Sequence, residues 1–310
     1  MELTGAAVRK GIAVTPPLLV AVPSGPDADG VEVTAGAYRS HLHRRPEKSR
    51  IARPARNASS CAAMASRLHQ NVRLARVRAS KLARLAVRPA LWPAVRAGVV
   101  PSVEHLGVPF QSNPRTVLDV GASRGQFATF ALHAFPHAQL ICFEPLPSSR
   151  AVLAKVTNGR AQIVPVAVGS EPGHSQIHVS GHDDSSSMLP IGERQVAEFP
   201  GTAEASVLDV EVVTLQSVLE PGVARPCLLK IDVQGLELEV LKGAGSGLAQ
   251  VDEILVECSF VEMYEGQALA DEVVNLLFAS GFRLRGVYGL VTGSDQTSLQ
   301  ADLLFRRQDA

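Results

Sequence analysis

The stretch "DVGASRGQF" (Asp119 to Phe127) decides how the rest of the chain is interpreted. It follows the apolar run Thr116 to Leu118 and leads into residues with helical spacing. A bend with two glycines between a buried strand and a helix lets a ligand approach the backbone closely. In sheets flanked by helices on both faces, ligands bind beyond the carboxyl ends of the strands. We therefore expect a ligand site at this bend.

From residue 113 onward, apolar segments of strand length alternate with segments of helical spacing. This alternation predicts an α/β fold: a doubly wound, mostly parallel sheet in three layers, α/β/α. Two final strands without an intervening helix predict an antiparallel C-terminal edge. The expected strands span 116–120, 139–143, 162–168, a short strand near residue 177, 207–213, 227–233, 251–257, 282–287 and 299–305. The expected helices span 124–135, 148–156, 236–242 with a stop at Gly243, and a helix around 269–277.

The charge distribution divides the chain. Of its 310 residues, the first 100 hold 17 Lys and Arg against 5 Asp and Glu, a difference of +12, whereas the remainder holds 13 against 25. Residues 22–60 are rich in Pro, Gly, Ser, Ala and Arg and show no sustained period, which is typical of disorder. We expect a disordered extension at 1–63, a basic helical segment at 64–112 and a catalytic domain at 113–310. A start of the natural product at Met64 is an open alternative.

Residues 66–88 have the pattern of a basic amphipathic helix ended by Pro89. Its apolar stripe is mostly alanine, and seven Lys and Arg residues lie between the apolar positions. Contact with an anionic membrane surface and contact with nucleic acid are two interpretations. We favour a helix that packs on the catalytic domain, keep peripheral membrane contact as an alternative, and expect no nucleic acid.

Neither the apolar runs nor the cysteines point to a membrane-embedded or disulfide-bonded protein. No apolar run approaches the length that crosses a bilayer. The apolar stretch 11–22 is interrupted by prolines and lacks a cleavage site, which disfavours export. The four cysteines, Cys61, Cys142, Cys227 and Cys258, show no CxxC spacing. We expect reduced thiols and a cytoplasmic protein.

Two cofactors compete for the bend after the first strand. A dinucleotide favours G-x-G-x-x-G, but here Gly121 and Gly125 are separated by three residues, with Ser123 in the middle. S-adenosylmethionine has a carboxylate and an ammonium group, which loop amides and the carboxylate of Asp119 would suit. Glu144, 23 residues after Gly121, fits the acidic residue that binds ribose hydroxyls in either case.

Several blocks together resemble the FkbM-type methyltransferases. In order they are "VLDVGASRGQFATFA", "FEPLP", "VPVAVGSEPG", "SSSML", "LLKIDVQGLELEVLKGA", "ILVECSFVEMYEGQ", "GFRL" and "LQADLLF", over residues 117–305. The resemblance implies a class I methyltransferase fold and S-adenosylmethionine as methyl donor. It also implies O-methylation of a small-molecule or glycan acceptor: a sugar, glycolipid, polysaccharide or polyketide-type product. One departure is Ser123, where this family commonly has Asn.

The same resemblance and the strand-end position assign donor-binding residues. We expect the donor to contact the first bend, the end of the second strand and the third block. The expected donor-binding residues are Asp119, Gly121, Ala122, Ser123, Gly125, Glu144, Ala167 and Val168.

The block "LLKIDVQG" supplies candidates for catalysis at the carboxyl end of the fourth long strand. Lys230 and Asp232 are two residues apart and so share one face of a strand, where burial is costly without a partner or a function. An alcohol needs a base, or a metal that acidifies it, before it attacks the methyl group. Asp232 is the expected base or metal ligand, Lys230 its partner or an acceptor-orienting group, and Glu257 a third carboxylate. Metal dependence remains open.

The segment after the third strand carries weaker signals. His174, His178 and His182 are spaced by four, but a turn and a strand do not place them on one helical face. We expect surface histidines, with His182 able to line the acceptor pocket. The loop at 181–201 holds a serine run, 185–187, which we expect to close over the donor. Tyr264 is either a pocket wall or a core aromatic residue.

Two other functions remain as alternatives at this stage. One is an NAD(P)-dependent oxidoreductase on the same type of sheet, disfavoured by the missing third glycine. The other is a non-catalytic protein whose basic arm contacts a membrane or nucleic acid. Nothing in the sequence identifies the methyl acceptor or the oligomeric state.

Overall fold

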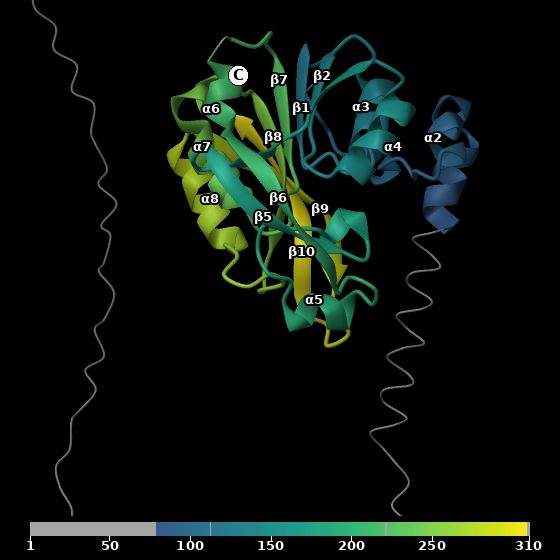
Figure 1. Ribbon diagram of the computed structural model, residues 1–310. Coiled ribbons are helices and arrows are strands. Elements are labelled where there is room, and N and C mark those ends of the chain that lie inside the picture. Colours follow the sequence, from purple (N-terminus) through teal and green to yellow (C-terminus); the bar gives the residue numbers. More distant parts are fainter. Residues whose placement is uncertain (1–78, 112, 221, 309–310) are drawn as a thin grey trace, which may run out of the picture. The chain divides into compact units, whose positions relative to one another are not determined.

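The computed structural model describes residues 79–111, 113–220 and 222–308, which all fall in one compact unit (Figure 1). The predicted extension at 1–63, Cys61 and the first part of the basic helix lie outside these residues. In the described part of the chain, no helix is long and apolar enough to cross a bilayer.

Seven strands form the central sheet, in the order β3-β2-β1-β7-β8-β10-β9. Five of them pair in parallel, whereas β10 runs antiparallel to both β8 and β9. The strands are β1 (Thr116–Val120), β2 (Gln139–Phe143), β3 (Ala161–Val164), β7 (Cys227–Ile231), β8 (Glu253–Ser259), β9 (Phe282–Thr292) and β10 (Ser298–Arg307). The predicted doubly wound sheet with an antiparallel edge is confirmed.

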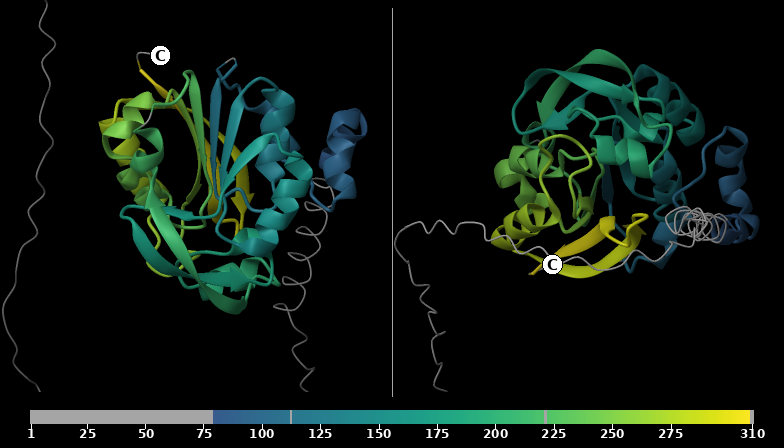
Figure 2. Two further views of the ribbon diagram at one scale, coloured as in Figure 1. Left: turned by 45° about the horizontal axis from the view of Figure 1, so that its top comes forward. Right: turned by 90° about the horizontal axis from the view of Figure 1, so that it is seen from below.

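Helices cover both faces of this sheet (Figures 1 and 2). One face carries α3 (Gln126–Ala134) and α4 (Pro147–Thr157); the other carries α6 (Leu215–Leu219), α7 (Glu237–Ala244) and α8 (Ala270–Ala279). Side chains alternate along each strand, so Val117 packs with the phenylalanines of α3 whereas Leu118 packs with the core under α7. Burial on both faces explains why these strands are continuous apolar runs.

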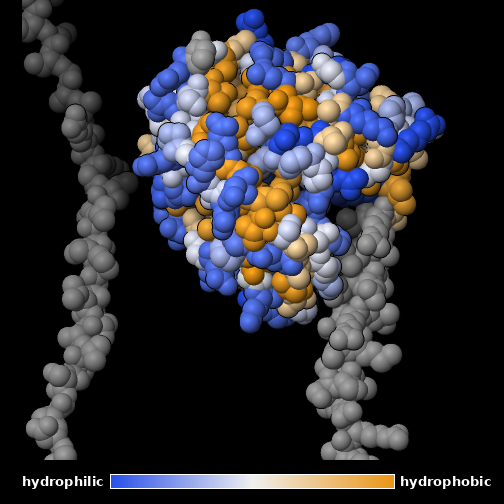
Figure 3. Space-filling view, viewed as in Figure 1, coloured by the Kyte–Doolittle hydropathy of each residue, from blue (hydrophilic) through white to orange (hydrophobic). Residues whose placement is uncertain are grey.

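The predicted strand 162–168 is wrong as a single element, because Pro165 divides it. Proline has no backbone N–H to donate to a ladder, and the chain leaves the central sheet there. β3 ends at Val164, and β4 (Ala167–Gly169) joins a second sheet in the order β4-β6-β5. That small sheet contains β5 (Gly173–Ser180) and β6 (Glu204–Thr214), both longer than predicted. On the side of the molecule seen in Figure 3, apolar side chains gather near the middle of the surface. Val207 and Leu208 of β6 are exposed to solvent.

The segment 181–201 is not the structureless loop that its polarity predicts. It contains a 3-10 turn, η3 (Asp183–Ser185), and a short helix, α5 (Glu193–Glu198). Single β-bridges tie Ser187 to His178 and Ile191 to Tyr264. Its few apolar residues pack on a cluster around Met263 and Leu299, and this burial orders a segment without a sequence period.

Several boundaries differ from the prediction for local reasons. Gly125 has a φ of 97°, so α3 begins at Gln126 rather than at residue 124. Gly243 does not end its helix: α7 continues to Ala244, and Gly245 takes the positive φ. A side chain on Gly243 would overlap the carbonyl oxygen of Gly169, so this glycine lets α7 lie close to β4.

The described N-terminal residues pack beside α3. Residues 79–86 are helical and are followed by η1 (Pro89–Leu91), α2 (Trp92–Arg96) and η2 (Val103–Gly107). Leu85 is buried with Leu91 and Val103, and Lys81 pairs with Glu104 at 3.1 Å. This packing agrees with the favoured interpretation of the basic helix, whose residues 66–78 lie outside the described part.

Three of the four expected thiols lie in the described residues. Cys142, Cys227 and Cys258 are buried and free. Burial raises the pKa of all three thiols, that of Cys227 to about 12. They are small apolar core residues with no thiolate character.

Candidate active site

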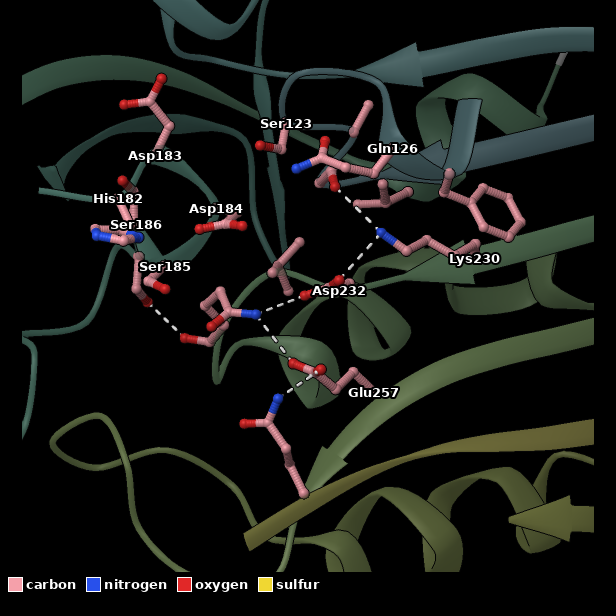
Figure 4. A pocket seen from close by; sticks show the side chains of 18 of the residues that line it. Ser123, Gln126, His182, Asp183, Asp184, Ser185, Ser186, Lys230, Asp232 and Glu257 are labelled. Atoms are coloured by element: carbon pink, nitrogen blue, oxygen red, sulfur yellow. Dashed lines mark hydrogen bonds and ion pairs between the residues drawn. The ribbon is translucent and has the colours of Figure 1, made fainter. Parts of the chain in front are cut away.

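A cavity of about 1090 Å³ lies at the carboxyl ends of β1, β2, β7 and β8. Its wall includes the bend after β1, the start of the small sheet, the segment 181–202 and the ends of β9 and β10. Residues of the N-terminal segment, among them Ser102 and His105, line it as well. The expected site at the first bend is therefore one end of a larger cavity (Figure 4).

The bend after β1 is held by the end of β2. The N–H groups of Gly121 and Ala122 donate to the Phe143 carbonyl at 3.2 and 3.0 Å, and the Ser123 N–H donates to Glu144 at 2.8 Å. These three amides therefore fix the bend and are not the free anion donors that the sequence suggested. Ala122 and Ser123 face the cavity.

Both glycines of the bend are needed because protein atoms occupy the space that a side chain would take. A side chain on Gly121, at φ 79°, would overlap the carbonyl oxygen of Asp232. A side chain on Gly125 would lie 2.8 Å from Val156 and 3.0 Å from Leu153 of α4. The close approach that these glycines permit is thus to protein atoms, although Gly121 also lines the cavity.

Glu144, just after β2, fastens two backbone segments. Its two carboxylate oxygens accept from the N–H groups of Ser123 and Leu146, both at 2.8 Å. Burial raises the pKa of Glu144 to about 7, although these two hydrogen bonds act in the opposite direction. Each oxygen keeps a second lone pair, so the carboxylate can still accept a ligand hydroxyl.

Asp119 is fully buried on β1, and neither of its oxygens has a hydrogen-bond partner among the described residues. Its compensation is an ion pair: Oδ1 lies 3.5 Å from Nζ of Lys230 on the neighbouring strand. Burial raises the pKa of Asp119, Lys230 lowers it, and the nearby Asp232 raises it again.

Lys230 connects the two aspartates. Its Nζ lies 3.3 Å from Asp232 Oδ2 and donates to the Gly121 carbonyl at 3.2 Å. The ammonium also lies 5.7 Å from the centre of the Phe127 ring. Burial lowers the pKa of Lys230, but Asp232 and Asp119 outweigh burial and leave the pKa above its usual value. The side chain is therefore a buried cation.

A glutamine that the sequence analysis did not single out joins the other two carboxylates. Gln234 Nε2 donates to Asp232 Oδ1 at 2.6 Å and to Glu257 Oε2 at 3.0 Å (Figure 4). Gln300 Nε2 donates to the second oxygen of Glu257 at 2.7 Å. Burial, followed by repulsion from Asp232, raises the pKa of Glu257. The expected cluster of Asp232 and Glu257 thus exists, but it is held through amides.

Tyr264 and the serine run support this glutamine. The Tyr264 hydroxyl donates to Gln234 Oε1 at 2.7 Å, and Ser187 Oγ donates to the Gln234 carbonyl at 2.7 Å. Tyr264 is buried, and burial raises its pKa far above the usual value. The question left open by the sequence is answered: Tyr264 is a core residue whose hydroxyl reaches the site. Ser185 and Ser186 line the cavity, and their closure over a donor stays a prediction.

The histidines do not form a metal site in the structure. His174 and His178 lie on β5, where His178 Nδ1 is 2.6 Å from Glu204, and His182 lines the cavity. Among the described residues, no group of three or more His, Cys, Asp or Glu side chains could hold a metal ion.

Sequence reasoning also missed three other cavity residues. His105 Nε2 lies 3.1 Å from Asp302 Oδ2, which joins the N-terminal segment to β10. Gln195 of α5 lines the cavity and is buried. These residues are brought together from distant parts of the chain, and none carries a local sequence signal. By contrast, the predicted Ala167 and Val168 do lie on the cavity wall.

Comparison with known proteins places this cavity in a family. The family model of the FkbM methyltransferase domain matches residues 119–284, more than half of the chain, including the carboxyl ends of β1, β2, β7 and β8. The chain belongs to the FkbM methyltransferase family. Membership confirms the resemblance seen in the sequence and the class I methyltransferase fold, and it decides for a methyltransferase over the oxidoreductase alternative.

Two curated relatives each match about half of the chain. The 2-O-methyltransferase NoeI of Sinorhizobium fredii is 29% identical over 170 residues, covering 52% of this chain and 70% of the relative. The 31-O-demethyl-FK506 methyltransferase FkbM of Streptomyces tacrolimicus is 30% identical over 192 residues, covering 54% and 72%.

A crystal structure of methyltransferase FkbM from Methylobacillus flagellatus is 13% identical, with a TM-score of 0.41. That match covers 66% of this chain and 46% of the solved chain.

Proposed function

We propose that this protein transfers a methyl group from S-adenosylmethionine to a hydroxyl oxygen of a small-molecule or glycan acceptor. The observation that carries the proposal is the row of acidic side chains Glu144, Asp232 and Glu257 at the ends of β2, β7 and β8, facing one cavity in a chain of this family. The names of two relatives, a 2-O-methyltransferase and a 31-O-demethyl-FK506 methyltransferase, specify O-methylation, which supports oxygen as the acceptor atom.

The residues at the first bend fit this donor. Ser123 Oγ and Gln126 Oε1 are buried polar atoms of the cavity wall without a hydrogen-bond partner among the described residues. Buried polar atoms are costly unless a hydrogen bond satisfies them, and a bound ligand could supply it. Glu144 would accept from the ribose hydroxyls, and Asp232 offers a carboxylate to an ammonium group, whereas the predicted donor ligand Asp119 is fully buried against Lys230 and does not line the cavity. Ala167 and Val168 would provide an apolar wall beside the donor.

Asp232 is the proposed base for the acceptor. The donor supplies an electrophilic methyl group, and the protein must align a hydroxyl with it and remove the proton. The Asp232 side chain is one-third exposed, at 33%, so it reaches the cavity while Lys230 and Gln234 hold its two oxygens. The hydroxyl proton would pass to this carboxylate as the bond from the hydroxyl oxygen to the methyl carbon forms and the bond from that carbon to the donor's sulfur breaks, with S-adenosylhomocysteine as the leaving group.

Lys230 forms an ion pair with Asp232, and Glu257 shares the Gln234 amide with it. These contacts position the proposed base in the cavity. The proposed acceptor classes remain a sugar, a glycolipid, a polysaccharide or a polyketide-type product.

The proposed catalytic unit contains residues 113–310, as the sequence suggests. It also includes the described N-terminal residues, because Lys81, Ser102 and His105 line the same cavity. Peripheral membrane contact through the basic helix stays a prediction.

Calorimetry tests the donor assignment directly. We expect S-adenosylmethionine and S-adenosylhomocysteine to bind the full chain and NADH to give no heat. Because hydrogen bonds to a charged group contribute about 1.5–3 kcal/mol, Glu144→Gln should weaken binding by roughly tenfold or more. If neither S-adenosylmethionine nor S-adenosylhomocysteine gives heat of binding, the proposal is refuted.

A further inference from the structure

The wall of the cavity opposite the strand ends is formed by the segment 181–202. The sequence did not assign a role to most of this segment. Its residues Asp183, Asp184 and Ser185 line the cavity, with Asp184 on the side of Asp232 (Figure 4), and α5 adds Gln195. Glu198 of α5 accepts from the Ser294 N–H at 3.1 Å, so α5 lies at the turn between β9 and β10, away from the donor-binding residues at the first bend and β2. We therefore assign the part of this wall formed by Asp184 and α5 to the acceptor side of the proposed reaction.

Gln195 has an unsatisfied side chain. The residue is 3% exposed, and its Oε1 is buried without a hydrogen-bond partner among the described residues. Its backbone carbonyl accepts from the Phe199 N–H and from Thr202 Oγ1, which fixes the end of α5. A buried amide oxygen that lines a cavity and lacks a partner is a hydrogen-bond acceptor available to a ligand.

Asp184 offers a second hydrogen-bond acceptor. Its carboxylate is exposed to the cavity and points toward the side of Asp232 in Figure 4. The Gln195 amide oxygen and the Asp184 carboxylate both accept hydrogen bonds, and a hydroxyl group can donate to either. The pair therefore suits an acceptor that carries more than one hydroxyl.

The charges around this wall disfavour an anion. Asp184, Asp232 and Glu257 all face the same space. Among the described residues, the two lysines that line the cavity are already ion-paired, Lys81 with Glu104 and Lys230 with Asp232. A phosphate or carboxylate on the acceptor would thus lose water and meet like charges; of the two imidazoles that line the cavity, that of His105 is paired with Asp302, and that of His182 belongs to this wall.

We propose that Asp184 and Gln195 determine acceptor specificity, binding hydroxyl groups of a molecule that carries no anionic group beside the methylated oxygen. This inference rests on the proposed function and narrows its substrate. Gln195 contributes affinity through its hydrogen bonds, and Asp184 excludes phosphates and carboxylates through its charge.

The experiment measures transfer of labelled methyl groups to matched sets of compounds: neutral methyl hexosides, the corresponding uronates and the corresponding 6-phosphates. The full chain is compared with Gln195→Leu, Asp184→Asn and Glu193→Gln, the last being an exposed residue of α5 outside the cavity wall. Binding of S-adenosylhomocysteine is measured for every variant.

We expect the wild type to methylate neutral members at least tenfold better than their anionic counterparts. Gln195→Leu should raise KM for a neutral member about tenfold, because a buried hydrogen bond is lost, while donor binding stays unchanged. Asp184→Asn should keep the neutral substrate within threefold and raise transfer to the anionic one. Glu193→Gln should match the wild type.

Three results would overturn the inference while donor binding persists: preference for the anionic members, transfer to none of the neutral members, or an unchanged KM in Gln195→Leu. Loss of donor binding in the wild type would instead refute the proposed function.

Discussion

The carbonyl oxygen of Asp232 occupies the space in which a side chain on Gly121 would begin. The bend that follows β1 and the chain that follows β7 are thus packed backbone against backbone. The Asp232 N–H also donates to the Val120 carbonyl at 3.1 Å. The position of the proposed base therefore depends on a glycine more than a hundred residues earlier in the sequence.

Substituting Gly121 by Ala should destabilise the protein strongly. The residue has a φ of 79°, which costs an Ala about 1–2 kcal/mol, and overlap with Asp232 adds about 1–3 kcal/mol. Gly159→Ala is the matched control, because its φ is 74° and nothing lies within 4 Å of the added carbon. Urea denaturation should show the Gly121 variant to be the less stable of the two, and equal losses would contradict the packing argument.

Removing the charge of Lys230 should leave two carboxylates without their shared cation. Breaking one partner of a buried ion pair typically costs 3–5 kcal/mol, so we expect Lys230→Met to lose roughly that much free energy of unfolding. Asp119→Asn in the same background should recover part of the loss, because the fully buried carboxylate is then gone. Double-mutant analysis of denaturation curves measures this coupling, and simple additivity would show that the pair is not coupled.

Much of the architecture was predictable because its signals are local. Strands buried on both faces are apolar runs, and each of the predicted parallel-sheet helices was found near its expected place. The exceptions follow from one residue or from long-range packing. Pro165 divided a strand between two sheets, and residues 181–201 acquired structure by packing on Met263 and Leu299.

The candidate site was predictable only in part, for the same reason. Lys230 and Asp232 could be paired in advance because strand geometry places residues two apart on one face. Gln234, Gln195 and the link from His105 to Asp302 depend on tertiary contacts between distant segments. The glycine bend was recognisable in the sequence, but only the structure shows that Gly121 packs against the backbone of Asp232.

The raised pKa of Glu144 predicts that the free energy of unfolding decreases as pH rises. The folded pKa is about 7 and the ordinary value is 4.5, so between these values the folded protein binds more protons than the unfolded chain. Stability must then decrease as pH rises through this window, by at most roughly 3 kcal/mol for this group. Glu237 acts in the same direction, because burial raises its pKa to about 7.

Glu144→Gln isolates the contribution of this one carboxyl. Free energies of unfolding measured at pH 5 and pH 8 should differ less in the variant than in the wild type, whatever its absolute stability. An unchanged difference would mean that Glu144 ionises normally in the folded protein.

The final prediction separates the proposed base from the group that positions it. Asp232→Asn keeps the shape of the side chain but cannot take a proton, so kcat should fall by about 10²–10⁴. Gln234→Leu removes the amide between Asp232 and Glu257 but leaves the base in place. We expect a smaller loss of kcat there, because the carboxylate that takes the proton is retained and only its orientation is loosened. Steady-state kinetics from pH 5 to 9, with binding of S-adenosylhomocysteine as the control, distinguishes the two roles. Near wild-type turnover in Asp232→Asn would show that another group accepts the proton.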